Sequence, residues 1–328
     1  MKKLICALLC VLMLATALVA CDKAPSEQPE ATLKMGLGVY TATPTTTDAT
    51  EEKDGQGKVA ITAAVISVDA DGKVVACQLD TADLTVKFTA DGKAIANDGF
   101  KTKYEQGADY NMVTYGGAAK EWFEQADAFE TVVVGKTLAE IKALVAEGNK
   151  GTADVVAAGC TIMINEFVNA IEKAAQGAKD SDLTKDAIVK VTMAAEQTCT
   201  DATEDKAGSN KIATTIFAAA LKDGKVALAS SDCVEIDFTF DVAGKSTFDA
   251  SKEIKSKREK GDNYNMVAYG GAVAEWYAQA DAFDAACVGK TASEIAGLMG
   301  EDGKAVADVQ AAGCTIYVSG FVAAASKI

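Results

Sequence analysis

Residues 110–129 read YNMVTYGGAAKEWFEQADAF, and residues 264–283 read YNMVAYGGAVAEWYAQADAF. These stretches belong to a longer match, in which residues 107–168 align with residues 261–322 without a gap and 36 of 62 positions are identical. Self-similarity at a fixed spacing is the signature of duplicated structure. The spacing of 154 residues is too long for a solenoid repeat and suits an ordinary domain. The sequence therefore predicts two tandem copies of one fold.

The boundaries of the copies follow from weaker matches on either side of this core. The sequence DGKV occurs at residues 71–74 and again at residues 223–226. We expect repeat 1 over residues 34–176, a linker over residues 177–184, and repeat 2 over residues 185–328.

The first half of each repeat has the pattern of β-strands. Val59–Val68 is rich in β-branched residues and precedes the turn signal Asp69-Ala70-Asp71-Gly72. Lys73–Leu79 then predicts the return strand of a hairpin, and the alternation over Leu84–Phe88 predicts a third strand. Repeat 2 has the same three predicted strands, at Lys211–Leu221, Lys225–Ala229 and Val234–Phe240.

The second half of each repeat has helical periodicity. Trp122, Ala126 and Phe129 fall on one face of a helix, as do the matching residues Trp276, Ala280 and Phe283. Capping boxes, in which a threonine precedes a glutamate by three residues, predict a further helix start in each repeat, at Thr137/Glu140 and Thr291/Glu294. Closing helices are expected over Ile162–Ala174 and Ile316–Ala325. Each repeat is thus predicted to be α+β, with a small antiparallel sheet followed by helices.

The N-terminus carries an export signal. Lys2 and Lys3 precede an uncharged apolar stretch of sixteen residues, Leu4–Val19, and the sequence Leu18-Val19-Ala20-Cys21 resembles the lipobox of bacterial lipoproteins. The alternative is an uncleaved anchor, but a spanning helix needs ~20 residues. The resemblance implies a signal peptide over residues 1–20, lipid on Cys21, and attachment to the extracytoplasmic face of a bacterial membrane. Residues 21–33 are polar and contain two prolines, which is typical of a flexible tether.

Composition excludes several classes of function. The 328 residues include no histidine, so Ser-His-Asp and Cys-His nucleophiles and histidine-ligated metals are excluded. The net charge of −15 disfavours nucleic acid as a partner, because neutralising phosphates requires a basic surface. Gly135-Lys136-Thr137 is no phosphate loop, because Glu130 stands where that motif requires glycine. A hydrolase is the least favoured class, and a binding protein or electron carrier is preferred.

Six cysteines remain after the signal segment and Cys21: Cys77, Cys160, Cys199, Cys233, Cys287 and Cys314. None forms a Cys-x-x-Cys pair, so we expect neither a zinc site nor thioredoxin-like chemistry. The sequence leaves open whether these thiols are free or paired.

The aromatic block within the repeat is a candidate binding site. Tyr110, Tyr115 and Trp122, and their counterparts Tyr264, Tyr269 and Trp276, have rings that can stack on a planar ligand. The glycine pair after Tyr115 would allow close backbone approach. The alternative is that these aromatic residues only fill the core beside a glycine turn.

The order of motifs resembles the FMN-binding domain family of extracytoplasmic bacterial proteins. That family has a Gly-x-Tyr-Thr strand, a hairpin with Asp-Gly-Lys, and a terminal Gly-Ala-Thr motif that opens a helix. Here the corresponding stretches are residues 38–41, residues 71–73, and Gly159-Cys160-Thr161. The second copy ends in Gly313-Cys314-Thr315.

The resemblance implies FMN as cofactor, with Thr161 and Thr315 as acceptors for covalent attachment by a flavin transferase. It also implies extracytoplasmic electron transfer to a redox partner. Without flavin, Thr161 and Thr315 can cap the closing helices, while Gly159 and Gly313 make the turns before them. A phosphate would be favoured at such a helix start.

The alternative is a flavin-free module for surface ligands or interactions. Ala158 and Cys160 replace residues that the family prefers at its acceptor motif. Two copies on one tether can raise avidity for a repeated ligand. In that case the aromatic block, rather than the threonines, would carry the binding.

Overall fold

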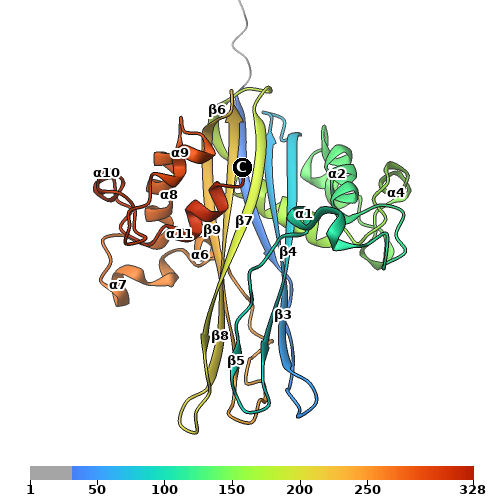
Figure 1. Cartoon of the computed structure of the whole chain (residues 1–328). Coiled ribbons are helices and arrows are strands. Elements are labelled where there is room, and N and C mark those ends of the chain that lie inside the picture. Colours follow the sequence, from blue (N-terminus) through green and yellow to red (C-terminus); the bar gives the residue numbers. More distant parts are fainter. Residues whose placement is uncertain (1–31) are drawn as a thin grey trace, which may run out of the picture. The chain divides into compact units, whose positions relative to one another are not determined.

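We describe a computed structural model of the chain over residues 32–328, which lie in one compact unit (Figure 1). The signal peptide, the lipidated Cys21 and nearly all of the tether predicted from the sequence lie outside the described residues. Across residues 32–328, no helix has the length and apolar character needed to cross a membrane.

Repeat 1 consists of strands followed by short helices. Its strands are β1 (Leu33–Thr41), β2 (Thr45–Thr47), β3 (Gly55–Val68), β4 (Val74–Phe88) and β5 (Ala94–Ile95). Its helices are α1 (Lys103–Gln106), η1 (Gly107–Tyr110), α2 (Trp122–Val133), α3 (Leu138–Lys142), η2 (Glu147–Asn149), α4 (Ala153–Ala158) and α5 (Asn165–Gln176), where η marks a 3-10 helix.

Repeat 2 follows the same order. Its strands are β7 (Ile188–Thr200), β8 (Gly208–Lys222) and β9 (Lys225–Phe240). Its helices are α6 (Lys257–Lys260), η3 (Gly261–Tyr264), α7 (Met266–Gly270), α8 (Trp276–Cys287), α9 (Ala292–Ala296), α10 (Ala307–Ala311) and α11 (Ser319–Ala325). The predicted α+β class, with antiparallel sheets followed by helices, is confirmed.

The sheets are antiparallel, with strand order β5-β4-β3-β1-β6 in repeat 1 and β7-β8-β9 in repeat 2. Strand β6 (Lys179–Leu183) falls within the segment expected to be a linker, and it pairs with β1. The short β2 pairs with β3 outside the main strand order.

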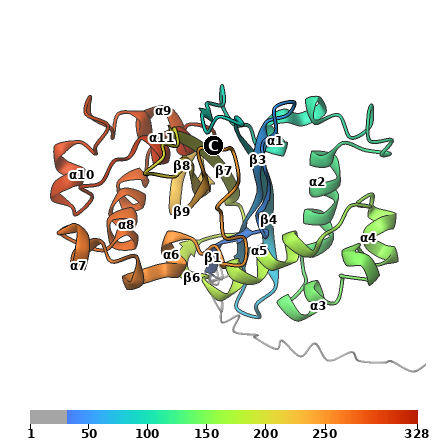
Figure 2. The ribbon, with the colours of Figure 1, turned by 90° about the horizontal axis from the view of Figure 1, so that it is seen from below.

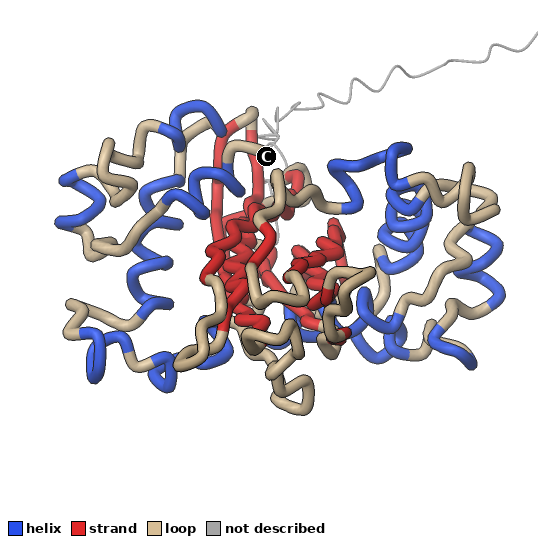
Figure 3. Tube along the Cα trace, turned by 60° about the horizontal axis from the view of Figure 1, so that its bottom comes forward, coloured by secondary structure: helices blue, strands red, loops and turns tan. Residues whose placement is uncertain are grey.

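Each sheet is buried on both faces, so the fold has four layers. One core lies between the two sheets and contains Ile61 of β3 together with Ile212 and Phe238 of the other repeat. A second core lies between the first sheet and helices α2 and α5, and a third lies between the second sheet and helices α8 and α11. Figures 2 and 3 show the strands in the middle and the helices on two opposite sides. Burial on both faces explains the nearly continuous apolar run at Val59–Val68.

The repeats meet through reciprocal contacts. Phe88 and Phe240, which occupy equivalent positions, stack with ring centroids 4.4 Å apart. The N–H of Ala49 donates to the carbonyl oxygen of Gly244 at 2.8 Å, and the equivalent N–H of Ala202 donates to that of Gly92 at 2.7 Å. The ion pairs Lys173–Glu259 and Lys327–Glu105 are likewise equivalent. Such reciprocity is typical of an isologous interface between two identical subunits, here joined in one chain.

The hairpin turn at residues 69–72, the helix face at Trp122 and both capping boxes are confirmed. The prediction of a separate third strand is wrong in both repeats. Val74–Phe88 is one strand, and so is Lys225–Phe240. Asp80 and Asp232 interrupt the apolar pattern, but both remain paired within their strands. Each carboxylate accepts a hydrogen bond from the backbone N–H of the next residue, and no turn forms.

The closing helices begin later than predicted. Helix α5 starts at Asn165, and the residue at its N-cap is Ile164, not Thr161. Met163 forms an isolated β-bridge with Lys150, and the N–H of Ile164 donates to the carbonyl oxygen of Asn149 at 2.8 Å. Because these residues pair with another segment, the helix cannot begin before them. The same bridge, Lys304 with Tyr317, delays helix α11 in repeat 2, so Thr315 does not cap it either.

Candidate functional site

Each repeat contains a cavity between its sheet and its helices, of about 520 Å³ in repeat 1 and about 480 Å³ in repeat 2. All fourteen residues that line the first cavity have their repeat counterpart among the residues that line the second. Nine of the fourteen pairs are identical in residue type: Ala60/Ala213, Lys103/Lys257, Tyr110/Tyr264, Met112/Met266, Trp122/Trp276, Lys150/Lys304, Thr161/Thr315, Ile162/Ile316 and Phe167/Phe321. The duplication has therefore kept a cavity as well as a fold.

A lysine, an acid and a tyrosine form the polar floor of each cavity. In repeat 1, Lys103 Nζ lies 3.1 Å from Asp83 Oδ2, and the Tyr110 hydroxyl donates to the same oxygen at 3.1 Å. The ammonium group also lies 5.2 Å from the centre of the Tyr110 ring and 5.6 Å from that of Trp122. The lysine is thus held by both charge and ring faces.

Repeat 2 reproduces this floor with a glutamate. Lys257 Nζ lies 3.1 Å from Glu235 Oε1, and the Tyr264 hydroxyl donates to Glu235 Oε2 at 3.0 Å. Burial would lower the pKa of Lys257, but the neighbouring acidic groups of Cys233 and Glu235 outweigh burial and raise it. Burial raises the pKa of both Tyr110 and Tyr264, so each hydroxyl keeps its proton and can donate.

The floor lysines are positioned by capped helices tied to the sheet. A capping box of Thr102 and Glu105 begins helix α1 at Lys103. Asp80 of strand β4 accepts a hydrogen bond from the backbone N–H of Tyr104 at 3.2 Å, which attaches this helix to the strand. Repeat 2 uses Ser256 with Glu259 for the cap and Asp232 for the attachment. The alternation of strand β4 places Asp83 on the helix side.

Thr161 and Thr315 line the cavities, as do Tyr110 and Tyr264. The amide oxygen of Gln125 accepts from the Thr161 backbone N–H at 2.9 Å and from its hydroxyl at 3.0 Å. Gln279 holds Thr315 in the same way, at 2.9 Å and 2.8 Å. The threonines are therefore fixed by a neighbouring helix rather than by capping the one that follows.

Gly159 and Gly313 make the turns before these threonines, as predicted, with φ of 110° and 115°. This left-handed region favours glycine. A Cβ on Gly159 would also approach Lys120 Nζ to 2.5 Å. Neither glycine lines the cavity of its repeat.

Tyr115 and Tyr269 do not line the cavities. Their side chains are 85% and 88% exposed, Tyr115 in a turn and Tyr269 in the short helix α7. Trp122 and Trp276 are buried in the cores between sheet and helices, and each also lines the cavity of its repeat. The aromatic block thus divides between core, cavity and surface.

Sequence reasoning missed the lysines and the glutamines. Lys103 and Lys150 lie on opposite sides of the aromatic block, 47 positions apart in the chain. Gln125 and Gln279 are 1% and 0% exposed, on helix faces that otherwise read as apolar. The available signal was that these residues are identical in both repeats, although lysine and glutamine are usually exposed.

Five of the fourteen lining positions differ between the cavities, and the differences at Glu166 and Met163 change the walls most. Glu166 in repeat 1 accepts a hydrogen bond from the Thr62 hydroxyl at 3.3 Å, whereas Gly320 stands in its place in repeat 2. A Cβ on Gly320 would come within 2.5 Å of Thr215 Oγ1. Met163 in the first cavity is replaced by Tyr317 in the second, and Lys304 Nζ lies 5.6 Å from the centre of the Tyr317 ring. The second cavity is thus less acidic on one wall and more aromatic at its edge.

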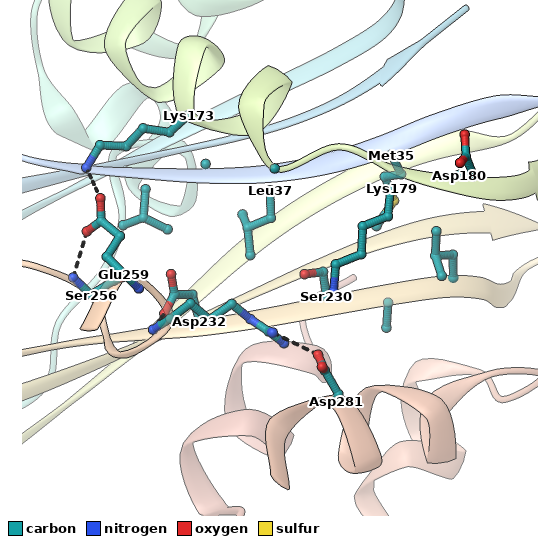
Figure 4. Close-up of a pocket in the computed structure, with 16 residues that line it drawn as sticks. Met35, Leu37, Lys173, Lys179, Asp180, Ser230, Asp232, Ser256, Glu259 and Asp281 are labelled. Atoms are coloured by element: carbon teal, nitrogen blue, oxygen red, sulfur yellow. Dashed lines mark hydrogen bonds and ion pairs between the residues drawn. The ribbon is translucent and has the colours of Figure 1, made fainter. Parts of the chain in front are cut away.

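A third cavity of about 390 Å³ lies between the repeats (Figure 4). The Lys173–Glu259 ion pair crosses it from one repeat to the other (Figure 4). Arg258 pairs with Asp281 at 2.7 Å. Arg258 also pairs with Asp284 at 3.0 Å. Because an ion pair joins the two repeats across it, this cavity is part of the contact between them.

The cysteines provide no reactive site. All six within the described residues are free. Burial raises the pKa of both Cys160 and Cys314 to about 11, so these thiols stay protonated near neutral pH. Across residues 32–328, no group of three or more cysteines, aspartates and glutamates gathers in a way that could hold a metal ion.

Comparisons of the chain with protein families, with curated proteins and with solved structures find no match.

Proposed function

We propose that each repeat binds one molecule of a small anionic ligand that carries a ring system, of the class of flavin mononucleotide. The observation that carries this proposal is that all fourteen positions lining one cavity recur in the other, with both lysines kept. Core packing does not require two lysines at equivalent places in two diverged repeats. A duplicated anionic ligand would require them.

The side chains present suit FMN. In repeat 1, Lys103 and Lys150 supply two ammonium groups for a phosphate, and Thr161 adds a hydroxyl. Met112 and Phe167 supply apolar wall for a ring. A cavity of about 520 Å³ falls within the ~300–1,000 Å³ typical of small-molecule sites. When bound, FMN would supply one- and two-electron redox chemistry, which makes electron transfer the accompanying role.

A stronger form of this proposal is that FMN is attached covalently to each repeat. Thr161 and Thr315 remain the proposed acceptors, because both lie at the cavity walls with their hydroxyl groups held by a glutamine. Covalent attachment is tested by measuring the mass of the whole chain after it has been expressed for export together with a flavin transferase. Two added FMN groups, lost one at a time in Thr161→Val and Thr315→Val, are expected. Unmodified mass would leave only reversible binding.

We also propose that the chain acts as a lipoprotein at the extracytoplasmic face of a bacterial membrane, with Cys21 as its lipidated residue. The support is the sequence alone, since Cys21 lies outside the described residues. Mass spectrometry of the N-terminal peptide is expected to find diacylglycerol on Cys21. An intact Met1 terminus would contradict the proposal.

Reversible binding is tested by calorimetric titration of the whole chain in detergent with FMN, riboflavin and inorganic phosphate. We expect FMN to bind most tightly, because it alone fills both the lysine-lined and the apolar parts of the cavity. Riboflavin and phosphate should each bind about 10-fold or more weakly, as each loses one set of contacts. A chain that binds none of the three would overturn the flavin proposal and favour the flavin-free surface module.

A further inference from the structure

Each repeat has exposed apolar side chains in its cavity lining and in the segment that begins at a lining methionine, Met112 or Met266. Tyr115 and Tyr269 are 85% and 88% exposed, and Met163 and Tyr317 are 63% and 68% exposed. Met163 and Tyr317 line the cavities themselves. Val113 and Val267, on the same loops as the tyrosines, are also largely exposed. The two repeats therefore present matching apolar edges to solvent.

Folding does not account for the identity of the exposed tyrosines. A buried aromatic residue can persist between duplicated halves because the core needs its volume. A side chain that is 85% exposed makes little contact with the core, and substitutions at such positions usually change stability very little. Tyr-Gly-Gly is nevertheless kept at Tyr115 and at Tyr269, while many other positions in the aligned segment have diverged. This points to a contact made outside the fold.

The loop that carries each tyrosine is fixed at its base beside the cavity. The buried carboxylate of Glu121 accepts from the backbone N–H groups of Met112 at 2.8 Å and Val113 at 3.2 Å. The N–H of Ala118 donates to the carbonyl oxygen of Met112 at 3.0 Å, which closes the loop. Tyr115 lies at the tip between these anchors.

Repeat 2 shows how the loop lies relative to the opening. Met266 and Ala272, the two ends of the loop, both line the cavity, and Tyr269 lies between them. Glu275 holds the first end by hydrogen bonds of 2.9 Å and 3.1 Å to its backbone N–H groups. Tyr269, in the single-turn helix α7, therefore lies in the chain between two residues that line the cavity.

A glycine pair follows each tyrosine. Gly117 and Gly271 have φ of 65° and 62°, which is left-handed backbone, and a Cβ at either would meet no atom within 4 Å. The backbone conformation, rather than lack of space, thus favours glycine here.

We propose that Tyr115 with Met163, and Tyr269 with Tyr317, form an outer subsite at each opening that holds the planar ring of the bound ligand. The anionic end of that ligand lies deeper, against Lys103 or Lys257, whose side chains are largely buried. This inference rests on the proposed function, because it assumes a ligand with an anionic end and a ring. It assigns to the exposed tyrosines a direct contact with the ligand.

The test compares Tyr115→Ala/Tyr269→Ala with the unmodified chain in titrations with FMN and with inorganic phosphate. Loss of stacking should weaken FMN binding roughly 10-fold at each site, on the scale of base stacking on aromatic residues. Phosphate, which has no ring, should bind unchanged. Val134→Ala/Val288→Ala is the matched control, since these valines are equivalent, about half exposed and outside both cavity linings.

A second variant keeps the ring and reports contact directly. Tyr115→Trp/Tyr269→Trp should bind FMN as tightly as the unmodified chain, with added tryptophan fluorescence that FMN quenches. FMN affinity that is unchanged in the alanine variant would overturn the outer subsite and leave the proposed function standing. An unmodified chain that does not bind FMN would overturn both.

Discussion

The two repeats keep the same buried acceptor but neutralise its charge differently. Glu130 of repeat 1 accepts from the backbone N–H of Leu79 at 2.7 Å, and Asp284 of repeat 2 accepts from that of Ser231 at 2.9 Å. In repeat 2 the guanidinium of Arg258 pairs with Asp284 at 3.0 Å. In repeat 1 the position of Arg258 is occupied by Tyr104, which carries no charge.

This difference in neutralisation changes the pKa values of the buried carboxyl groups. Burial raises the pKa of Glu130 to about 8 and that of its neighbour Asp80 to about 7. Burial also raises the pKa of Asp284, but the charge of Arg258 limits the rise to about 6. The fold therefore requires an acceptor for the strand N–H at this position, and either a protonated or an ion-paired carboxyl satisfies it.

Removing Arg258 should have the largest effect on stability. Arg258→Met leaves Asp284 buried without its cation, and breaking a buried pair in this way typically costs 3–5 kcal/mol. We expect the free energy of unfolding at pH 7 to fall by about 3 kcal/mol, because Arg258 is partly exposed. Urea unfolding measures it, with Tyr104→Phe as the control, which should change stability by less than about 1 kcal/mol. If Arg258→Met and Tyr104→Phe lowered the free energy of unfolding equally, the difference inferred between the two repeats would be contradicted.

Glu130 and Asp80 of repeat 1 should contribute to the pH dependence of stability, and Asp284 and Asp232 of repeat 2, whose pKa values burial also raises, should add to it. The pKa values of Glu130 and Asp80 in the folded chain exceed their ordinary values of 4.5 and 3.8. Between its ordinary pKa and its raised pKa in the folded chain, each carboxyl group keeps a proton in the folded state that it has released in the unfolded state. The free energy of unfolding therefore falls as pH rises.

We expect the free energy of unfolding to decrease between about pH 4.5 and pH 8, by at most about 1.4 kcal/mol per pH unit for each group. Glu130→Gln keeps an oxygen that can accept from Leu79 and should flatten this slope. Asp284→Asn, which removes the buried partner of Arg258 and leaves only its pair with Asp281, should destabilise instead. A slope that Glu130→Gln leaves unchanged would show that another group is responsible.

Replacing a floor lysine should weaken binding in one repeat alone. Lys103→Met removes the proposed charge-assisted contact to the phosphate of FMN and should lower FMN affinity at that site about 10- to 100-fold. Lys257→Met should do the same in repeat 2. Calorimetry would then resolve one strong and one weak site in each variant. Two sites of equal FMN affinity in both variants would show that these lysines do not contribute to binding.

The smallest effect is expected at the wall position that differs between the cavities. Glu166→Gln removes a negative charge beside the proposed phosphate position and makes the first cavity more like the second. FMN affinity of repeat 1, measured in the Lys257→Met background, should rise about threefold, as expected for one charge in a partly solvated site. A decrease would mean that Glu166 contacts the ligand favourably.

Local patterns in the sequence predicted local structure well. The turn at Asp69–Gly72 and the capping box at Thr137 depend on neighbours within a few residues, and both are confirmed. The continuous strand Val74–Phe88 was missed, because the hydrogen bonds that keep Asp80 within it come partly from a helix start 24 residues away.

The site was harder to predict, because its parts meet only in three dimensions. Thr161 and Tyr110 were identified from motifs, and they do line one cavity. Lys103 joins them only because its helix is attached to the strand that carries Asp83. Tyr115 was grouped with the buried aromatic residues, since sequence alone does not show which side of a glycine loop faces solvent.

The central claim is that duplication has produced two working copies of one binding site. Native mass spectrometry of the whole chain, released from detergent and saturated with FMN, counts bound ligands directly. The account predicts two FMN molecules per chain, one in Lys103→Met or Lys257→Met at limiting FMN, and none in the double variant. One or no FMN on the unmodified chain, or two on the double variant, would contradict it.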